Sequence, residues 1–156
     1  MNVKQHTTAL IVALVAATSA NTLYAHCEVP CGIYGDQLRF EQMLEDQKTI
    51  AKAIDSIRDL AGNGDALSVN QAGRWITTKE SHATNVQHTI AQYFMTQRIK
   101  GGADGYVKKL TAAHAVMVAA MKCKQTADPK TADTLGKAIL NFYRAYEGKE
   151  PKFHKE

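Results

Sequence analysis

Four runs of apolar residues with helical spacing, separated by breaks rich in glycine or proline, constrain the fold of this chain most strongly. In the first run, apolar residues recur every three or four positions from Phe40 to Ala61, and only Gln47 is polar. This spacing puts them on one face of an α-helix, with Asp36 in the place of an N-cap. The run stops at the Gly-Asn-Gly-Asp sequence of residues 62–65. It predicts a helix from Asp36 to about residue 61.

The second run predicts a helix that starts near Ser68–Gln71 and is stopped by Gly101-Gly102. Its apolar stripe comprises Trp75, Ile76, Ala83, Val86, Ile90, Tyr93 and Phe94. The third run predicts a helix over about residues 104–124, with one side formed by Tyr106, Val107, Leu110, His114, Met117 and Met121. We therefore expect His114 to be a hydrogen-bonded histidine in the core rather than a metal ligand.

The fourth run begins at Asp128-Pro129, because Asp128 or Thr131 can cap a helix and proline is tolerated in a first helical turn. It ends at Gly148, and its apolar stripe comprises Leu135, Ala138, Ile139, Phe142 and Tyr146. We expect the tail, residues 151–156, to be frayed.

The fold class predicted from these runs is all-α, because no segment shows convincing strand alternation. Four amphipathic helices joined by short polar loops bury their stripes best in an antiparallel up-and-down four-helix bundle. Residues 36–150 would form this bundle. A bundle does not define a function, which has to be argued from a site.

Residues 1–25 have the features of a secretion signal that is removed from the mature protein. Lys4 supplies a positive start, residues 9–17 are apolar, and small or polar residues follow as far as Ala25. The apolar stretch is too short to span a bilayer, so no membrane anchor is expected in the mature form. The sequence predicts a periplasmic or secreted protein.

Two cleavage positions compete. A cut after Ala20 has Thr18 three positions from the cleaved bond, whereas a cut after Ala25 has the larger Leu23 there. The signal rules alone leave both possibilities open. Whether a signal peptidase or a dedicated maturation protease makes the cut is open as well.

Removal of residues 1–25 lowers the formal net charge from +4 to +3, because Lys4 is the only charged residue lost. This mild charge lacks the basic stripe of a nucleic-acid-binding protein, although it would favour a small anion. The three cysteines of the chain cannot all pair with one another. Cys123 has no neighbouring cysteine and is expected to be a free thiol.

His26, Cys27 and Cys31 place one imidazole and two thiols within six residues, and a cut after Ala25 would add a free α-amine. The amine, the Cys27 amide nitrogen and two thiolates can lie in one plane, an arrangement that favours nickel or copper over tetrahedral zinc. The bare Cys-x-x-x-Cys spacing in an exported protein is also typical of a short disulfide. Pro30 bends and stiffens the loop between the two cysteines.

The nine residues from His26 to Tyr34 resemble the nickel hook of the nickel superoxide dismutase family, whose pattern is H-C-x-x-P-C-G-x-Y at the processed N-terminus. The resemblance implies a hook at residues 26–35 that holds one nickel per subunit. The ligands would be the amine and imidazole of His26, the amide and sulfur of Cys27, and the sulfur of Cys31. Tyr34 would stand at the open face where superoxide arrives.

The same resemblance implies an enzyme that converts superoxide to dioxygen and hydrogen peroxide by cycling Ni(II) and Ni(III), with His26 and Tyr34 as catalytic residues. It also implies a four-helix subunit that assembles into a homohexamer. Glu41 matches a carboxylate that holds the axial imidazole, and His82 stands where the family often has arginine. Pro30, Glu41 and His82 are therefore expected to support the ligands from outside.

Two other functions remain compatible with the residues. An exported nickel or copper carrier could use the same hook for delivery without turnover. A helical adhesion or signalling module could use the two hook cysteines as a disulfide.

Overall fold

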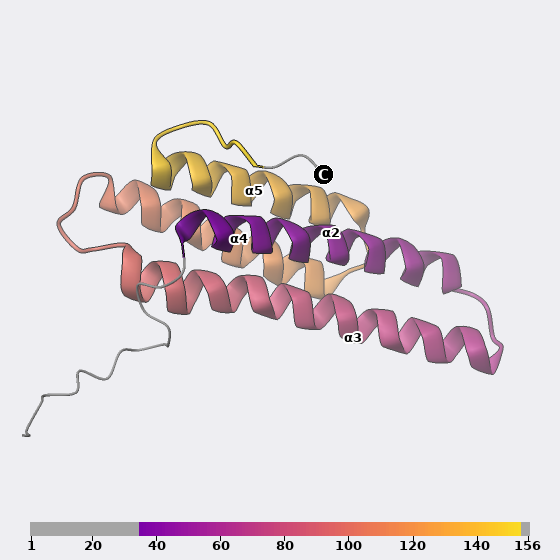
Figure 1. Ribbon diagram of the computed structural model, residues 1–156. Coiled ribbons are helices and arrows are strands. Elements are labelled where there is room, and N and C mark those ends of the chain that lie inside the picture. The colour runs from indigo at the N-terminus through magenta and orange to yellow at the C-terminus, as the bar shows by residue number, and fades with distance from the viewer. Residues whose placement is uncertain (1–34, 154–156) are drawn as a thin grey trace, which may run out of the picture.

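The computed structural model describes residues 35–153, and every regular element in this range is a helix (Figure 1). The elements are α2 (Asp36–Leu60), α3 (Ala66–His88), η1 (Thr89–Arg98), α4 (Tyr106–Gln125) and α5 (Pro129–Glu147). The η1 segment continues α3 with π-helical winding. The four predicted helices are thus confirmed.

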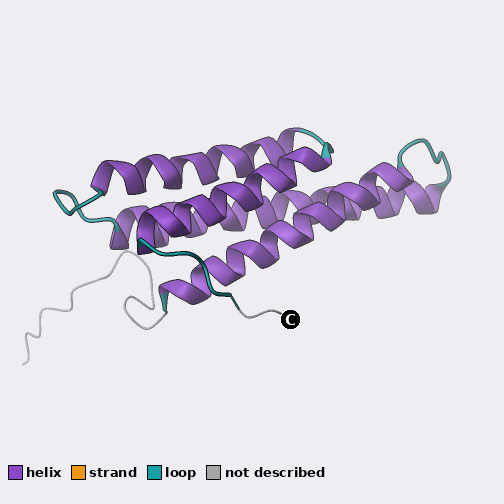
Figure 2. Cartoon of the chain, turned by 90° about the horizontal axis from the view of Figure 1, so that it is seen from above, coloured by secondary structure: helices purple, strands orange, loops and turns teal. Residues whose placement is uncertain are grey.

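The helices run alternately up and down, and each packs against its neighbours in the sequence (Figure 2). The last helix, α5, closes the bundle by packing against α2. The predicted four-helix bundle is therefore confirmed. We call the end at which α2 and α4 begin and η1 and α5 finish the entry end, because the chain enters the bundle there at Gly35.

An aromatic cluster fills the core near the entry end. Phe40, Phe94 and Phe142 are fully buried, and the Phe40 ring centroid lies 4.8 Å from that of Phe94 and 5.2 Å from that of Phe142. Tyr143 and Tyr146 of α5 complete the contacts around Phe40. The rings join α2, η1 and α5 near the entry end.

Gln47, the one polar member of the first apolar stripe, has a structural explanation. Its side-chain nitrogen donates to the backbone oxygen of Ala132 at 3.0 Å, so the amide is satisfied inside the α2–α5 contact. A Cβ atom at Gly136 would meet the Gln47 side chain at 3.4 Å. The glycine thus leaves room for the glutamine between the two helices.

The helix ends agree with the sequence in part. Asp128 caps α5 by accepting from the Lys130 amide, and Gly148 ends it in the left-handed conformation, as predicted. The second helix begins earlier than expected, at Ala66, because Asp65 accepts from the Ser68 amide. Asp36 was predicted as an N-cap and is not one. Gly35 occupies the cap position, and the Asp36 side chain is used elsewhere.

The predicted buried face of α4 is confirmed for Tyr106, Leu110 and Met117, which pack against the core. It was wrong for Val107, His114 and Met121. Small side chains face the core, namely those of Ala113, Val116, Ala119, Ala120 and Cys123. Val107 and Met121 are 72% and 40% exposed, and His114 is exposed rather than in the core. The helix is apolar on most of its circumference, so its periodicity did not select one face. Close packing of small residues against its neighbours decided the orientation.

Lys79 is a buried cation that the α3 stripe did not predict. Its side chain is 5% exposed, and the ammonium nitrogen donates to the backbone oxygens of Cys123 at 2.6 Å and Lys124 at 2.7 Å. These carbonyls belong to the last turn of α4, where intrahelical donors are lacking. A positive charge there also interacts favourably with the negative end of the helix dipole. Lys79 therefore caps α4 from the neighbouring helix.

The tail is more ordered than predicted as far as Phe153. Its ring packs edge-on against Tyr143 with a centroid distance of 5.1 Å, and the chain turns back along α5 in Figure 1. The Gln37 side chain reaches the backbone oxygen of Lys152 at 3.5 Å. The end of the tail, residues 154–156, lies outside the described residues.

None of the helices described here is long and apolar enough to cross a membrane.

Candidate functional site

The Asp36 carboxylate collects donors from two other elements at the entry end. Its Oδ1 atom accepts from the Tyr93 hydroxyl at 2.6 Å and lies 3.0 Å from Arg98 Nε. Its Oδ2 atom accepts from the Tyr146 hydroxyl at 2.8 Å. Arg98 also donates from Nη2 to the Tyr93 hydroxyl at 2.8 Å. We call these four residues the Asp36 cluster.

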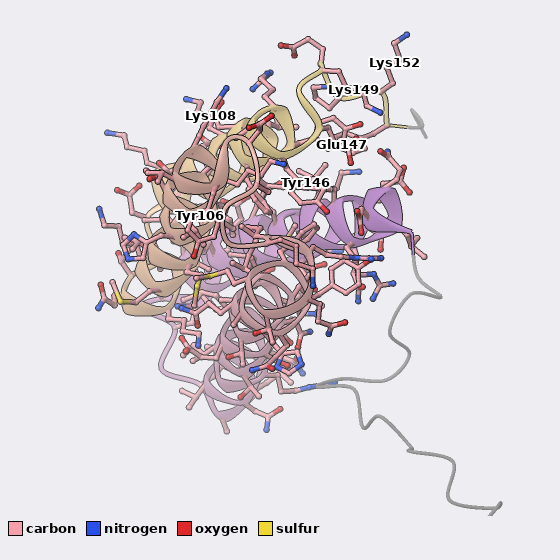
Figure 3. All side chains as sticks on the ribbon, turned by 90° about the vertical axis from the view of Figure 1, so that its left-hand side faces the viewer. Tyr106, Lys108, Tyr146, Glu147, Lys149 and Lys152 are labelled. Carbon is pink, nitrogen blue, oxygen red and sulfur yellow. The ribbon has the colours of Figure 1, made fainter. Side chains whose placement is uncertain are left out.

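The cluster joins α2, η1 and α5 through polar groups that are only partly exposed. The side chains of Asp36 and Arg98 are 27% and 29% exposed. Burial and the neighbouring Asp36 carboxylate raise the pKa of Tyr93 and of Tyr146, so both phenols remain hydrogen-bond donors. In Figure 3, which faces this end of the molecule, Tyr146 points into the bundle while Lys108 and Lys152 lie at the periphery.

Glu41, predicted to support the axial imidazole, lies on α2 just over one helical turn beyond Asp36. It is partly buried, and its carboxylate accepts from Gln37 Nε2 at 2.8 Å. An open cavity of about 360 Å³ lies beside Glu41, and Phe153 of the tail forms part of its wall. The carboxylate is thus accessible from the side on which the tail lies.

His82, the other residue predicted to support the ligands, pairs with a carboxylate that the sequence analysis did not single out. Its Nδ1 atom lies 2.6 Å from Oδ1 of Asp46, which is 7% exposed. Asp46 stands three positions after Met43 and four before Ile50, both buried, so its place on the apolar stripe was a signal that could have identified it. The described partner of His82 is therefore Asp46.

The Asp46 pair makes folding depend on pH. Burial raises the pKa of the Asp46 carboxyl above its ordinary value of 3.8, although His82 opposes the shift. The stability contributed by the protonated form is complete below pH 3.8 and is lost as pH rises through the higher pKa of the folded state.

We expect Asp46→Asn to remove this loss, because asparagine does not titrate. The wild-type free energy of unfolding minus that of the variant should decrease as pH rises above 3.8. Urea unfolding of both proteins at several pH values would measure it. If the free energies of unfolding of the two proteins changed in parallel with pH, the raised pKa of Asp46 would be contradicted.

The predicted ligands and their neighbours lie outside the described residues. These are His26, Cys27, Pro30, Cys31 and Tyr34. Gly35, the first described residue, connects this segment directly to Asp36. The predicted ligand positions are therefore not tested by the geometry.

Within residues 35–153, no group of three or more histidine, cysteine or acidic side chains could hold a metal ion. Cys123 is fully buried and free, and burial raises the pKa of its thiol. A donor set with two thiols and an imidazole is present in the sequence before Gly35, where His26, Cys27 and Cys31 lie close together. The chemistry of that donor set fits nickel.

A family model described as nickel-containing superoxide dismutase matches residues 21–150. The match covers residues 21–34 together with all the helices described above. Neither the curated proteins nor the solved structures gave a match.

Proposed function

The chain belongs to the nickel-containing superoxide dismutase family. On this premise, we propose that residues 26–35, which begin the mature protein, form its nickel centre. The enzyme is an oxidoreductase that converts superoxide to dioxygen and hydrogen peroxide, with nickel as its cofactor. The family match over residues 21–150 is the observation that carries the function, because it includes both the donor residues and the bundle that supports them.

The proposed ligands are the α-amine and imidazole of His26, the amide nitrogen and sulfur of Cys27, and the sulfur of Cys31, with one nickel per subunit. Nickel, when bound, supplies the one-electron couple that oxidises one superoxide and reduces the next. Thiolate and amide donors release electron density and so favour the higher oxidation state. Pro30 holds the two cysteines close by fixing the backbone between them.

Two protons must reach the substrate for each hydrogen peroxide that is formed. We assign Tyr34 the role of orienting superoxide or water through its hydroxyl at the open face. Glu41 and His82 would support the ligands from the first and second helices. The partly buried carboxylate of Glu41 and the Asp46 contact of His82 are compatible with these roles, because each side chain has a defined partner.

Maturation is part of the proposal. A signal peptidase or a maturation protease cuts after Ala25, so that His26 becomes the first residue. The features of residues 1–25 support export to the periplasm or to the outside of the cell.

The proposed assembly is a homohexamer that covers the hooks at subunit contacts. Its support is the amount of exposed apolar surface on α3 and α4. Leu67, Val69 and Val107 are 69%, 61% and 72% exposed, and Ile76 and Met121 are each at least 40% exposed. A subunit contact would remove these side chains from water, which is favourable in proportion to the apolar area buried. Analytical ultracentrifugation of the mature protein tests it, and a monomer at working concentration would refute it.

The central test is the N-terminal sequence and intact mass of exported protein, measured before and after nickel is added, together with superoxide turnover. A chain that begins at His26, gains one nickel and shows a rhombic Ni(III) electron-spin signal is expected. A mature chain that begins at Asn21 would refute the proposed centre, because the amine would be five residues away from His26. Tight nickel binding without turnover would indicate the carrier function instead.

The role of Tyr34 is tested separately with Tyr34→Phe. Loss of the hydroxyl should lower kcat by about 100-fold or more, the range expected for a positioned proton-transfer group, while nickel content stays at the wild-type value. Turnover and nickel content are measured on the same preparation. Equal loss of both would show that Tyr34 holds the hook together and does not serve the substrate.

A further inference from the structure

We propose that the Asp36 cluster is a positioning device that fixes the hook on the bundle, an inference that rests on the proposed function of residues 26–35. Asp36 is the first residue of α2 and follows Tyr34 by two positions. Anything that holds Asp36 therefore sets the point from which the hook leaves the bundle. The partners that hold it lie on helices distant from it in the sequence, Tyr93 and Arg98 on η1 and Tyr146 on α5.

The Asp36 carboxylate makes more contacts than are needed to start a helix. An acidic residue in the first turn is stabilised by the helix dipole without any partner. Here both carboxylate oxygens are used, since Oδ1 faces Tyr93 and Arg98 while Oδ2 faces Tyr146. Contacts in two directions restrict rotation of the side chain and movement of the backbone that carries it. Charge-assisted hydrogen bonds of this kind are among the stronger ones in proteins.

The π-helical winding of η1 brings two members of the cluster together. Tyr93 and Arg98 are five positions apart, and in an α-helix such residues lie on different faces. In η1 the backbone bonds link residues five apart, as in the bond from the Ile99 amide to the Phe94 oxygen at 2.8 Å. Arg98 can therefore reach the Tyr93 hydroxyl and stack over its ring, with 4.9 Å from the guanidinium carbon to the ring centroid.

Chain geometry limits how far the cluster can be from the metal ligands. Asp36 follows Cys31 by five positions, and a fully extended chain of that length spans at most about 18 Å. The position of Asp36 thus restricts the volume that the Cys31 sulfur can occupy. A hook with a fixed base needs to lose less conformational entropy when it closes on nickel.

The test compares the mature, nickel-loaded enzyme with Asp36→Asn and Arg98→Gln variants. The asparagine keeps the size and one acceptor oxygen but removes the charge. We expect nickel to be lost to a chelator about 10-fold faster in each variant, and the rhombic Ni(III) signal to broaden as the hook samples more positions. Tyr146→Phe, which removes only the contact to Oδ2, should show a smaller change in the same direction.

The double variant and a matched control separate positioning from general stability. The effects of Asp36→Asn and Arg98→Gln on nickel loss should be less than additive, because both break one interaction. Glu150→Gln breaks another ion pair at the entry end, that of Arg144 and Glu150 at 2.9 Å, without touching α2. It should leave nickel loss and the spin signal as in wild type. Thermal unfolding of each apo variant monitors the bundle itself.

Two results would overturn the inference, and they are distinguishable. If wild type holds nickel and the Asp36 and Arg98 variants hold it equally well with an unchanged spin signal, the cluster only stabilises the bundle. The proposed function would then stand. If the mature wild-type chain holds no nickel, the proposed function fails and this inference fails with it.

Discussion

A mature protein that retains Ala25 ahead of His26 is expected to lose superoxide turnover by more than about 100-fold. Substitution of residues that only contact the metal ligands typically lowers activity by up to about 100-fold, and loss of a ligand should have a larger effect. The extra residue leaves every side chain unchanged. It converts the α-amine of His26 into a peptide nitrogen, whose lone pair is delocalised over the amide. The proposed neutral amine ligand is thereby lost, because a peptide nitrogen, like that of Cys27, can bind nickel only after it has lost its proton.

The measurement pairs turnover with nickel content and the electron-spin spectrum of the extended and the mature proteins. A chain with one additional residue after Glu156 has the same added mass and serves as the control. This control should have the turnover, nickel content and electron-spin spectrum of the mature protein. Wild-type turnover in the protein that retains Ala25 would show that the terminal amine is not a ligand.

The second large effect is expected in the aromatic cluster. Phe40→Ala should lower the free energy of unfolding by about 3–5 kcal/mol, the range for loss of a fully buried phenylalanine. Phe40 is 0% exposed and contacts the rings of Phe94, Phe142, Tyr143 and Tyr146. The loss is a large part of the 5–15 kcal/mol that stabilises an ordinary domain. Urea unfolding of the apo protein measures it.

Leu38→Ala is the matched control for Phe40, because Leu38 lies on the same helix and is 50% exposed. Substitution there should change the free energy of unfolding by less than about 1 kcal/mol in the monomeric subunit. Similar losses for the two variants would contradict the assignment of Phe40 to the core. A larger effect of Leu38→Ala in the assembled enzyme would indicate that Leu38 lies in a subunit contact.

The fold could be predicted because its signals are local. Helical spacing, the Asp128 cap and the glycine at position 148 each depend on a few neighbouring residues, and all three are confirmed. Which side of α4 is buried depends instead on which side packs most closely against the neighbouring helices. A helix with apolar residues on most sides carries no local signal for that choice, so Val107 and His114 were assigned to the wrong environment.

The polar contacts of the bundle were harder to predict than its core. The partners of Asp36 come from positions 93, 98 and 146, and no local pattern connects these residues. The π-helical winding of η1 was not predicted because its spacing differs only slightly from that of an α-helix. The ligands of the proposed centre were easier to recognise, since the nine residues from His26 to Tyr34 are contiguous in the sequence.

An enzyme that releases hydrogen peroxide exposes its own sulfur atoms to an oxidant. Peroxide attacks the thiolate form of an accessible cysteine. The Cys123 side chain is fully buried, and burial raises its pKa, so it offers neither access nor thiolate. Among the described sulfur-containing residues, Met121 is the most exposed, at 40%, and is the one where oxidation should begin. The packing of α4 thus protects Cys123 from the product of the enzyme's own reaction and leaves Met121 exposed to it.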